Sequence, residues 1–470
     1  MQHPLQSTRR RFLKQVGLSG IGALALPLVL PSRVLGAGGA NNRLNIAIIG
    51  CGGRSRQLMP WIFESGENIV ALCDVDTRQF SASKQEAAKH GPAGASVQKA
   101  RLYQDYRKLL EAEKAADAVD AVVIATGQRW HVPLCKAALG AGKHVYCEKA
   151  LAHSVAQARE IGQVTQGCKL ATQVGSHGGA ADTFRRAMEV IQAGLLGQIR
   201  EVHCWITRGF GPSESLAQVA DPIPPELNWD FWCGPSRLLP FKNYYLGDGV
   251  NWGHWLEFGD GHLADMGAHG LNLPWRALKL GGPTRVSVEI PEVLKDSYPS
   301  ATKFRWDYPA RGDLAPVALW WHDGGNAAPP VQLGAELLAT YHNVPNDGVL
   351  FVGEKGLLLS GAWGTGGVVK LNGEARFRGV LDHEAAKPIP VTLPRARNQN
   401  NMLEWTDACK GLTTAFQSFP TASCVAEIAM TGIVALRFGR LIDWDNEAMK
   451  VVGAPEADAL VHRPMRRKWL

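Results

Sequence analysis

This sequence lacks the cysteine patterns that mark zinc sites and disulfide scaffolds. Its nine cysteines include no Cys-x-x-Cys pair, their number is odd, and several lie inside apolar runs. We therefore expect most of them to be small buried hydrophobic residues. No internal repeat or low-complexity tract is present either, so nothing in the sequence indicates a repeat array.

A strongly basic body is missing as well. The formal net charge is +7, but residues 1–40 carry five basic residues and no acidic one, which leaves only +2 for the rest of the chain. A body so close to neutral gives no electrostatic reason to expect nucleic-acid binding.

The first 40 residues have the three regions of an export signal. Thr8-Arg9-Arg10-Arg11-Phe12-Leu13-Lys14 precedes an apolar run over 16–30, and small residues follow near Leu35-Gly36-Ala37. The adjacent arginines are typical of the twin-arginine pathway. The run is interrupted by glycine and proline, and it is short for a bilayer span of about 20 residues. We expect a periplasmic or secreted protein that uses the twin-arginine translocation machinery, with an uncleaved membrane anchor as the alternative.

The remaining chain of about 430 residues is too long for one ordinary core, so two domains are expected. From residue 43 to about 175, short β-branched runs alternate with helical stretches, which indicates βαβ units and a parallel sheet. We place a Rossmann dinucleotide-binding domain at 41–175 and a substrate domain at 176–470. The expected strands are 44–49, 68–73, 119–125, 143–147 and 169–174, and the expected helices are 53–63, 77–90, 104–113, 131–141 and 154–166.

The first turn from strand to helix carries a dinucleotide fingerprint, Gly50-Cys51-Gly52-Gly53-Arg54-Ser55. Gly50 permits the tight turn, and Gly52 lets the backbone approach a diphosphate that the helix N-terminus attracts. Ser55 stands where glycine or alanine is usual, and it is small enough for close packing of helix and strand. A plain tight turn is the alternative reading of this segment.

Asp74 follows the second expected strand, 24 residues after Gly50. A carboxylate there accepts hydrogen bonds from the ribose hydroxyls of the adenosine and repels a 2′-phosphate, which favours NAD over NADP. Arg54 or Arg78 could counter that repulsion. The alternative is that Asp74 only terminates a strand.

Two further motifs make a family recognisable. Ala125-Thr126-Gly127-Gln128-Arg129-Trp130-His131 ends one strand, and Gly142-Lys143-His144-Val145-Tyr146-Cys147-Glu148-Lys149-Ala150-Leu151 spans the next. With the fingerprint, they resemble the glucose–fructose oxidoreductase/inositol dehydrogenase (Gfo/Idh/MocA) family, from about Asn42 to the C-terminus. The resemblance implies NAD-dependent chemistry on a sugar, a polyol or a glycoside, and an oligomer (dimer or tetramer) built on the open sheet of the second domain.

The resemblance also assigns roles to residues. Gly50, Gly52, Gly53, Arg54, Ser55 and Asp74 would hold the dinucleotide, together with Thr126, Trp130, His131 and Glu148. Lys149 would reach both the cofactor and the substrate hydroxyl beside the carbon that loses hydride. The family usually has a cis proline where this chain has Ala150. A non-proline cis bond costs about 3–4 kcal/mol, so the sequence predicts a trans bond before Ala150.

Past residue 175, strands outnumber helices and many are joined by short turns. This pattern predicts an α+β domain with a mostly antiparallel open sheet and helices on one face. The expected strands are 199–207, 285–290, 316–322, 334–341, 349–352 and 356–360, and the expected helices are 181–193, 401–411 and 421–440.

Asp265 and His269 are four residues apart and would share one face of a helix. A carboxylate beside an imidazole sets its tautomer and raises its basicity, so we expect Asp265 to orient His269 for catalysis. By resemblance this is the family's Asp-x-x-x-His element, although Asn272 replaces a further acid. A structural pair at a helix start is one alternative. A metal site that adds His262 is another, and we assign no metal.

Nine of the chain's 15 tryptophans lie between 205 and 321. Aromatic faces suit sugars, but anchoring of loops explains most of these residues. We select Trp252, Tyr244 and His254 as substrate contacts, and His177 because it follows a strand end.

These features predict an enzyme in which Lys149 or His269 removes a hydroxyl proton while the adjacent carbon gives up hydride. Export argues for a tightly held cofactor that is reset on the enzyme. One alternative is therefore a redox-neutral glycosidase, lyase or epimerase that oxidises its substrate transiently. Another is a non-catalytic sugar-binding protein, which Ala150 and Asn272 would permit.

Overall fold

The computed structural model describes residues 43–247, 249–325 and 327–466. The export signal expected over residues 1–40 lies outside these ranges. All nine cysteines lie inside them and are free, and seven are buried, which confirms their expected role as small hydrophobic residues.

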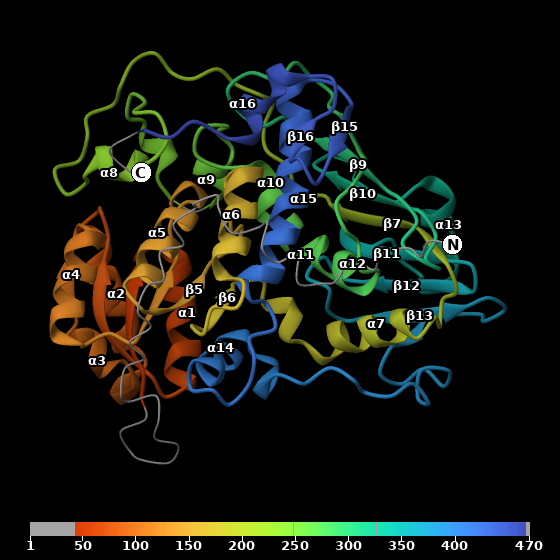
Figure 1. The fold of residues 1–470 in the computed structure, drawn as a ribbon, viewed down its shortest axis with the longest axis horizontal. Helices are drawn as coiled ribbons and strands as arrows, with labels where there is room; N and C mark the ends of the chain where they lie inside the picture. The colour runs from red at the N-terminus through yellow and green to blue at the C-terminus, as the bar shows by residue number, and fades with distance from the viewer. Residues whose placement is uncertain (1–42, 248, 326, 467–470) are drawn as a thin grey trace, which may run out of the picture.

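The first domain is built on a six-stranded parallel sheet of order β3-β2-β1-β4-β5-β6. The predicted parallel sheet is thereby confirmed, although the short, polar β3 escaped prediction. Figure 1 shows helices of this domain in red and orange at the left. The strands are β1 (Asn45–Ile49), β2 (Asn68–Cys73), β3 (Arg101–Tyr103), β4 (Ala121–Ile124), β5 (His144–Cys147) and β6 (Thr172–Val174).

Helices cover both faces of this sheet because alternate strand residues point to opposite sides. Ile46 and Ile48 pack towards one face, and Ala47 and Ile49 towards the other. The helices are α1 (Gly53–Glu64), α2 (Arg78–Ala88), α3 (Ala95–Gln98), α4 (Tyr106–Ala116), α5 (Gln128–Gly140) and α6 (Val155–Thr165). Side chains of α1 and α2 pack in the hydrophobic cluster that contains Ile46 and Ile48. Side chains of α4, α5 and α6 pack in the cluster that contains Ala47 and Ile49.

The second domain is built on a ten-stranded sheet of order β14-β13-β12-β11-β7-β10-β9-β8-β15-β16. Among the strand pairs described for this second sheet, β7 and β10 are parallel and the others are antiparallel. The predicted mostly antiparallel sheet is therefore confirmed. The strands are β7 (Ile199–Ile206), β8 (Arg285–Glu289), β9 (Thr302–Tyr308), β10 (Val317–Asp323), β11 (Asp347–Gly353), β12 (Gly356–Ser360), β13 (Val368–Leu371), β14 (Arg378–Gly379), β15 (Ile442–Asp445) and β16 (Lys450–Val451).

One predicted strand, 334–341, is wrong because this segment belongs to helix α13 (Val331–Tyr341). Leu333 and Leu337 are four residues apart, and both pack with Trp205 of β7 in one hydrophobic cluster. The helical period and this contact outweigh the strand-like run of leucines. The helix also covers the sheet face opposite the main core, so helices do not lie on one face only.

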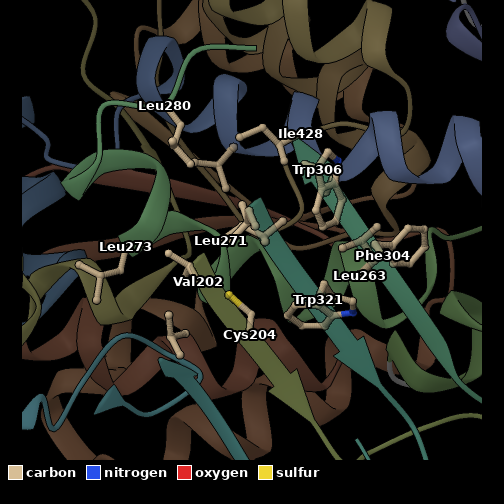
Figure 2. Close-up of a cluster of buried hydrophobic side chains, with 14 of the residues drawn as sticks. Val202, Cys204, Leu263, Leu271, Leu273, Leu280, Phe304, Trp306, Trp321 and Ile428 are labelled. Atoms are coloured by element: carbon tan, nitrogen blue, oxygen red, sulfur yellow. The ribbon is translucent and has the colours of Figure 1, made fainter. Parts of the chain in front are cut away.

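The main core of the second domain supports the segment that carries the predicted Asp265 and His269. Figure 2 shows Val202 and Cys204 of β7 and Trp321 of β10 beneath Leu263 and Leu271, with Ile428 above. The helices around this core are η4 (His177–Ala180), α7 (Asp182–Gln192), α10 (Gly261–Asp265), α11 (Gly267–Gly270), α12 (Asn272–Ala277) and α15 (Phe419–Phe438).

Two C-terminal helices tie the domains together. Helix α14 (Asn401–Cys409) returns to the first sheet, where Met402 and Trp405 pack in the cluster of β1 and α1. Helix α15 packs against α6 of the first domain and β8 of the second. It is long and apolar enough to cross a bilayer, yet 78% of its apolar window is buried inside the protein. Packing between the two domains accounts for that composition.

Candidate active site

A cavity of about 710 Å³ runs along the carboxyl edge of the parallel sheet and continues to the second domain. This edge is where doubly wound sheets bind their ligands. Thirteen of the residues selected from the sequence line it: Gly50, Gly52, Gly53, Arg54, Asp74, Thr126, Trp130, Glu148, Lys149, His177, Trp252, Asp265 and His269.

The glycine turn has the shape that a diphosphate requires. Gly50 has a φ of +87°, and a Cβ there would lie 2.6 Å from the Ala125 carbonyl oxygen. At Gly52 and Gly53 an added Cβ would meet nothing within 4 Å, so the backbone faces open space at the start of α1. Buried Ser55 donates to the Gly52 carbonyl at 2.9 Å and lies behind the cavity wall.

Asp74 is held at the end of β2 by two backbone amides. Its carboxylate accepts from Cys51 N at 2.6 Å and from Asp76 N at 2.8 Å. Burial raises the pKa of Asp74 to about 6, although the amide hydrogen bonds act in the opposite direction. The two arginines that could accept a 2′-phosphate are each paired, Arg78 with Asp76 at 2.8 Å and Arg54 with Glu148 at 2.9 Å. These residues fit NAD.

Lys149 joins the two domains at the centre of the cavity. It follows β5 and forms an ion pair with Asp265 at the end of α10. The predicted trans bond before Ala150 is wrong, because the Lys149–Ala150 peptide is cis. Ala150 is buried, and its carbonyl accepts from His131 Nδ1 at 2.6 Å, so surrounding groups hold this segment.

The sequence predicts that Asp265 contacts His269, but the carboxylate of Asp265 contacts Lys149 instead. No hydrogen bond joins Asp265 to His269 among the described contacts, because the helix breaks at Met266 between α10 and α11. Burial would raise the pKa of Asp265, but the charge and hydrogen bond of Lys149 outweigh it and lower that pKa. Asp265 therefore positions the ammonium group of Lys149.

His269 is a buried residue of the cavity wall. It is 3% exposed, and its Nδ1 has no hydrogen-bond partner among the described residues. Burial, then the charges of Lys149 and His177, lower the pKa of His269 well below its usual value. The His177 ring lies 5.1 Å from it, and burial lowers the pKa of His177 too. The site thus offers a neutral base beside a cation.

Three other selected residues do not line the cavity. His131 is buried behind it, with Nδ1 2.6 Å from the Ala150 carbonyl oxygen and Nε2 3.0 Å from the Thr126 carbonyl oxygen. Tyr244 is exposed and stacks on Trp255. His254 stacks on Phe210 at 4.6 Å. Two of the nine clustered tryptophans, Trp232 and Trp252, reach the cavity. The expectation that most of them anchor loops is wrong, because four of the nine belong to strands of the ten-stranded sheet: Trp205, Trp306, Trp320 and Trp321.

Among the wall residues that sequence reasoning did not select are Arg129, Arg208 and Trp363. Arg129 is buried, and its guanidinium donates to the Trp232 carbonyl at 2.6 Å while lying 4.0 Å from that ring. Arg208 follows β7, and Trp363 lies in the loop after β12. Only Arg129 stands in a motif that the sequence analysis singled out. Arg208 and Trp363 stand in segments without a motif.

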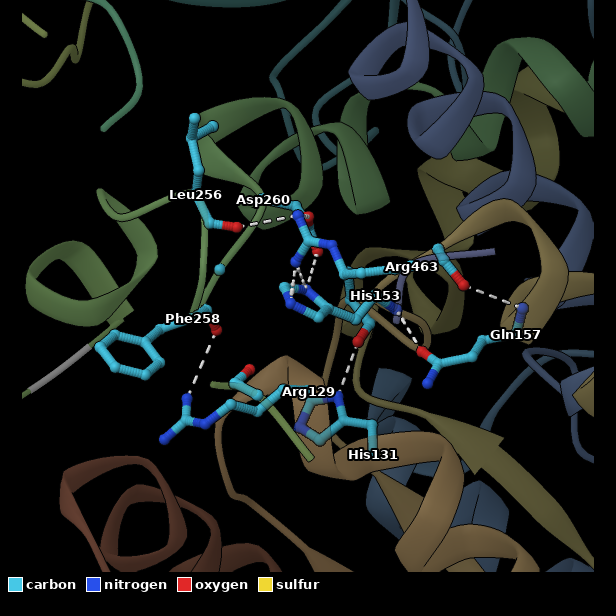
Figure 3. Close-up of polar contacts among 12 residues, drawn as sticks. Arg129, His131, His153, Gln157, Leu256, Phe258, Asp260 and Arg463 are labelled. Atoms are coloured by element: carbon cyan, nitrogen blue, oxygen red, sulfur yellow. Dashed lines mark hydrogen bonds and ion pairs between the residues drawn. The ribbon is translucent and has the colours of Figure 1, made fainter. Parts of the chain in front are cut away.

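A buried polar network holds the second domain's loop against the first domain (Figure 3). His153, just before α6, contacts Asp260 at 2.6 Å, and Asp260 directly precedes α10. Arg463 from the C-terminal segment contacts His153, pairs with Asp260 at 3.3 Å and donates to the Leu256 carbonyl at 2.9 Å. Arg466 continues the contact by donating to the Gly234 carbonyl at 2.8 Å.

Within the described ranges, no three His, Cys, Asp or Glu side chains are placed to share a metal ion. His262 instead stacks on Phe210 with ring centroids 4.1 Å apart. Asn272 lies outside the cavity wall and accepts a hydrogen bond from Arg276 at 3.0 Å.

Comparison with known proteins identifies the first domain. A profile described as an oxidoreductase family with an NAD-binding Rossmann fold (Gfo/Idh/MocA) matches residues 44–176. A glycosyl hydrolase family 109 protein of Parabacteroides distasonis is 27% identical over 218 residues, which are 43% of this chain and 44% of that protein. An inositol 2-dehydrogenase of Burkholderia multivorans is 30% identical over 167 residues, which are 34% of this chain and 45% of that protein. The match covers less than half the length of these relatives.

Solved structures show the same fold over most of the chain. An inositol dehydrogenase homolog of Azotobacter vinelandii, solved with NADH and myo-inositol, superposes with a TM-score of 0.56 at 18% identity. That superposition covers 86% of this chain and 98% of the other. The sequence prediction of an NAD-binding Rossmann domain followed by an α+β domain is confirmed.

Proposed function

We propose that this protein is an NAD-dependent oxidoreductase that acts on a carbohydrate or polyol, because the Gfo/Idh/MocA oxidoreductase profile matches its first domain. One observation carries the proposal. A single cavity runs from the glycine turn and Asp74 to Lys149, Asp265 and His269. The substrate then lies between a dinucleotide site and a set of proton-transfer groups.

The residues divide the work between binding and proton transfer. Gly52, Gly53 and the start of α1 would hold the diphosphate, and Asp74 would hold the adenosine ribose. Bound NAD supplies a hydride acceptor. His269 lines the cavity with its pKa lowered by burial, so its imidazole would take the hydroxyl proton of the substrate. The Lys149 ammonium, held by Asp265, stabilises the negative charge that develops on the same oxygen.

The relatives favour a second version of this chemistry. Several are described as glycosyl hydrolase family 109 proteins, including one from Solibacter usitatus that is 33% identical over 159 residues. We propose as an alternative that a transient ketone acidifies the neighbouring C–H, and that His269, after passing its first proton to solvent, removes this second proton while the leaving group departs as an alcohol. Water would then add to the unsaturated ketone, and reduction of the ketone would leave bound NAD unchanged overall. This version suits an exported enzyme because NADH is not readily recycled outside the cytoplasm.

The cellular setting is part of the proposal. The basic and apolar segments of residues 1–40 support export of the folded, NAD-loaded protein through the twin-arginine pathway. The ten-stranded sheet offers an edge and a face on which a dimer or tetramer could assemble.

The test begins with the exported protein, purified without added cofactor. Bound NAD is expected in the purified protein, identified by mass after denaturation. Sugars, polyols and glycosides are then assayed with no NAD present. Cleavage of a glycoside without net NADH release supports the redox-neutral version, and turnover only with added NAD and matching NADH release excludes it. A protein that neither contains nor binds NAD excludes both versions.

A further inference from the structure

We infer that the substrate carries an anionic group, a carboxylate or a phosphate, and that Arg208 binds it. The inference rests on the proposed function and adds the charge class of the substrate. Its basis is the way in which the charges of the cavity wall are paired.

The other cationic side chains of the wall are already engaged. Arg54 pairs with Glu148 and Lys149 with Asp265. The guanidinium of Arg129 is buried among backbone carbonyls. Arg208 has neither an ion pair nor a side-chain hydrogen bond within the described part of the chain, yet it lines the same cavity. It therefore adds an unbalanced positive charge to the wall.

Arg208 belongs to the substrate half of the cavity. It comes from the second domain, two residues after β7, whereas the glycine turn and Asp74 come from the first. Phe210, two residues further on, stacks on His262, which lies three residues before Asp265 on α10. The Arg208 charge also lowers the pKa of His262, after the larger effect of burial. Arg208 thus lies close to the element that holds Lys149.

The backbone around Arg208 is fixed. Gly324 N donates to the Arg208 carbonyl at 3.0 Å. At Gly209 a Cβ would lie 2.5 Å from the Ser300 carbonyl oxygen, so this position packs tightly against its neighbours. A fixed backbone with an unpaired guanidinium suits recognition of an anion, since the planar fork binds carboxylate or phosphate oxygens in pairs.

The test compares matched sugars on the NAD-containing protein. Glucose, glucuronate, the neutral methyl ester of glucuronate, and glucose bearing a phosphate on its terminal hydroxyl are titrated by calorimetry. The galactose series is titrated in parallel. We expect at least one anionic sugar to bind about tenfold more tightly than its neutral counterpart, as for a charged hydrogen bond worth about 1.5 kcal/mol. The carboxylate and phosphate arms identify which anion is preferred, and added salt should weaken that preference.

Variants then assign the preference to Arg208. R208Q should remove the tenfold preference for the anionic sugar, and R208K should retain part of that preference. R200Q is the matched control, because Arg200 lies at the other end of β7, is exposed and pairs with Glu354 at 3.4 Å. The inference is overturned if no anionic sugar binds more tightly than its neutral partner, or if R208Q keeps the preference.

These outcomes separate the inference from the proposed function. Hydride transfer from neutral polyols alone would uphold the proposed function and overturn the anionic substrate. If the protein contains no NAD but binds an anionic sugar through Arg208, the anionic ligand is upheld and the proposed oxidoreductase function is overturned.

Discussion

At the scale of the residue, the site depends on how charges are paired around Lys149. Asp265 stabilises the ammonium group of Lys149, and that ammonium in turn helps to keep His269 neutral. Two groups with different charge at neutral pH thus face one cavity. This division of roles is typical of sites that bind an oxyanion and remove a proton.

Replacing Lys149 with methionine should slow the chemical step and leave the cofactor in place. Charge stabilisation and proton transfer each contribute about 100-fold or more, so kcat should fall by at least about 100-fold. NAD content, measured after denaturation, should stay the same. The control is Lys136→Met, an exposed lysine of the same domain paired with Glu160. Equal loss of activity in both variants would contradict the role of Lys149.

Replacing Asp74 with alanine should weaken discrimination between cofactors. The carboxylate binds ribose hydroxyls and repels a 2′-phosphate. Its loss should therefore lower the affinity for NAD about tenfold and reduce the ratio of the NAD affinity to the NADP affinity. Fluorescence titration of the cofactor-free protein with each dinucleotide measures the ratio. If the ratio does not change, Asp74 does not contact the ribose.

At the scale of the element, the C-terminal segment acts on the site from a distance. Arg463 and Arg466 hold the loop from α8 (Trp229–Cys233) to Asp260 against the first domain. That loop supplies Trp232 and Trp252 to the cavity and leads directly into α10.

Replacing Arg463 with methionine should destabilise the protein and raise KM. The change removes the Arg463 guanidinium from the fully buried Asp260, which keeps its contact with His153, so part of the about 3–5 kcal/mol that breaking a buried pair costs is expected. Chemical denaturation measures the free energy of unfolding. The double variant that adds Asp260→Asn should recover part of the lost free energy of unfolding, because it removes the buried negative charge that Arg463 neutralises. If the two effects were simply additive, the pair would not be coupled.

The alternating elements of the first domain could be predicted because each helix and strand there has a strong local period. The prediction of elements from the sequence failed where an element is very short, or where its conformation depends on contacts with residues far away in the sequence. Segment 334–341 looks like a strand, and it becomes a helix because Leu337 packs on Trp205, far away in sequence. Arg208 and Arg463 belong to the site through tertiary packing alone, so no local pattern reveals them.

At the scale of the whole molecule, buried histidines make the fold sensitive to acid. Burial lowers the pKa of His131, His144, His153 and His322 to about 4. An unfolded chain, with histidines near 6.5, binds more protons between these two values. The stability that the neutral histidines contribute is therefore present above pH 6.5 and is lost as pH falls towards 4.

The free energy of unfolding should fall steadily between pH 6.5 and 4. Each histidine can contribute on the order of 3 kcal/mol to this loss. Asp74 and Asp323, whose pKa values burial raises to about 6, offset part of it because they bind protons in the folded state. Denaturant titrations across this range measure the slope. A stability that is flat or rises as pH falls would show that these histidines are accessible to protons in the native state.

The most direct test of the central claim is the near-ultraviolet absorbance of the purified, NAD-containing protein after anaerobic addition of sugars and polyols. A substrate should produce the absorbance of reduced nicotinamide without added cofactor, and His269→Asn should suppress its appearance while NAD stays bound. The account predicts that signal for at least one carbohydrate. Bound NAD that is never reduced across the panel, with His269→Asn and wild type behaving alike, would contradict it.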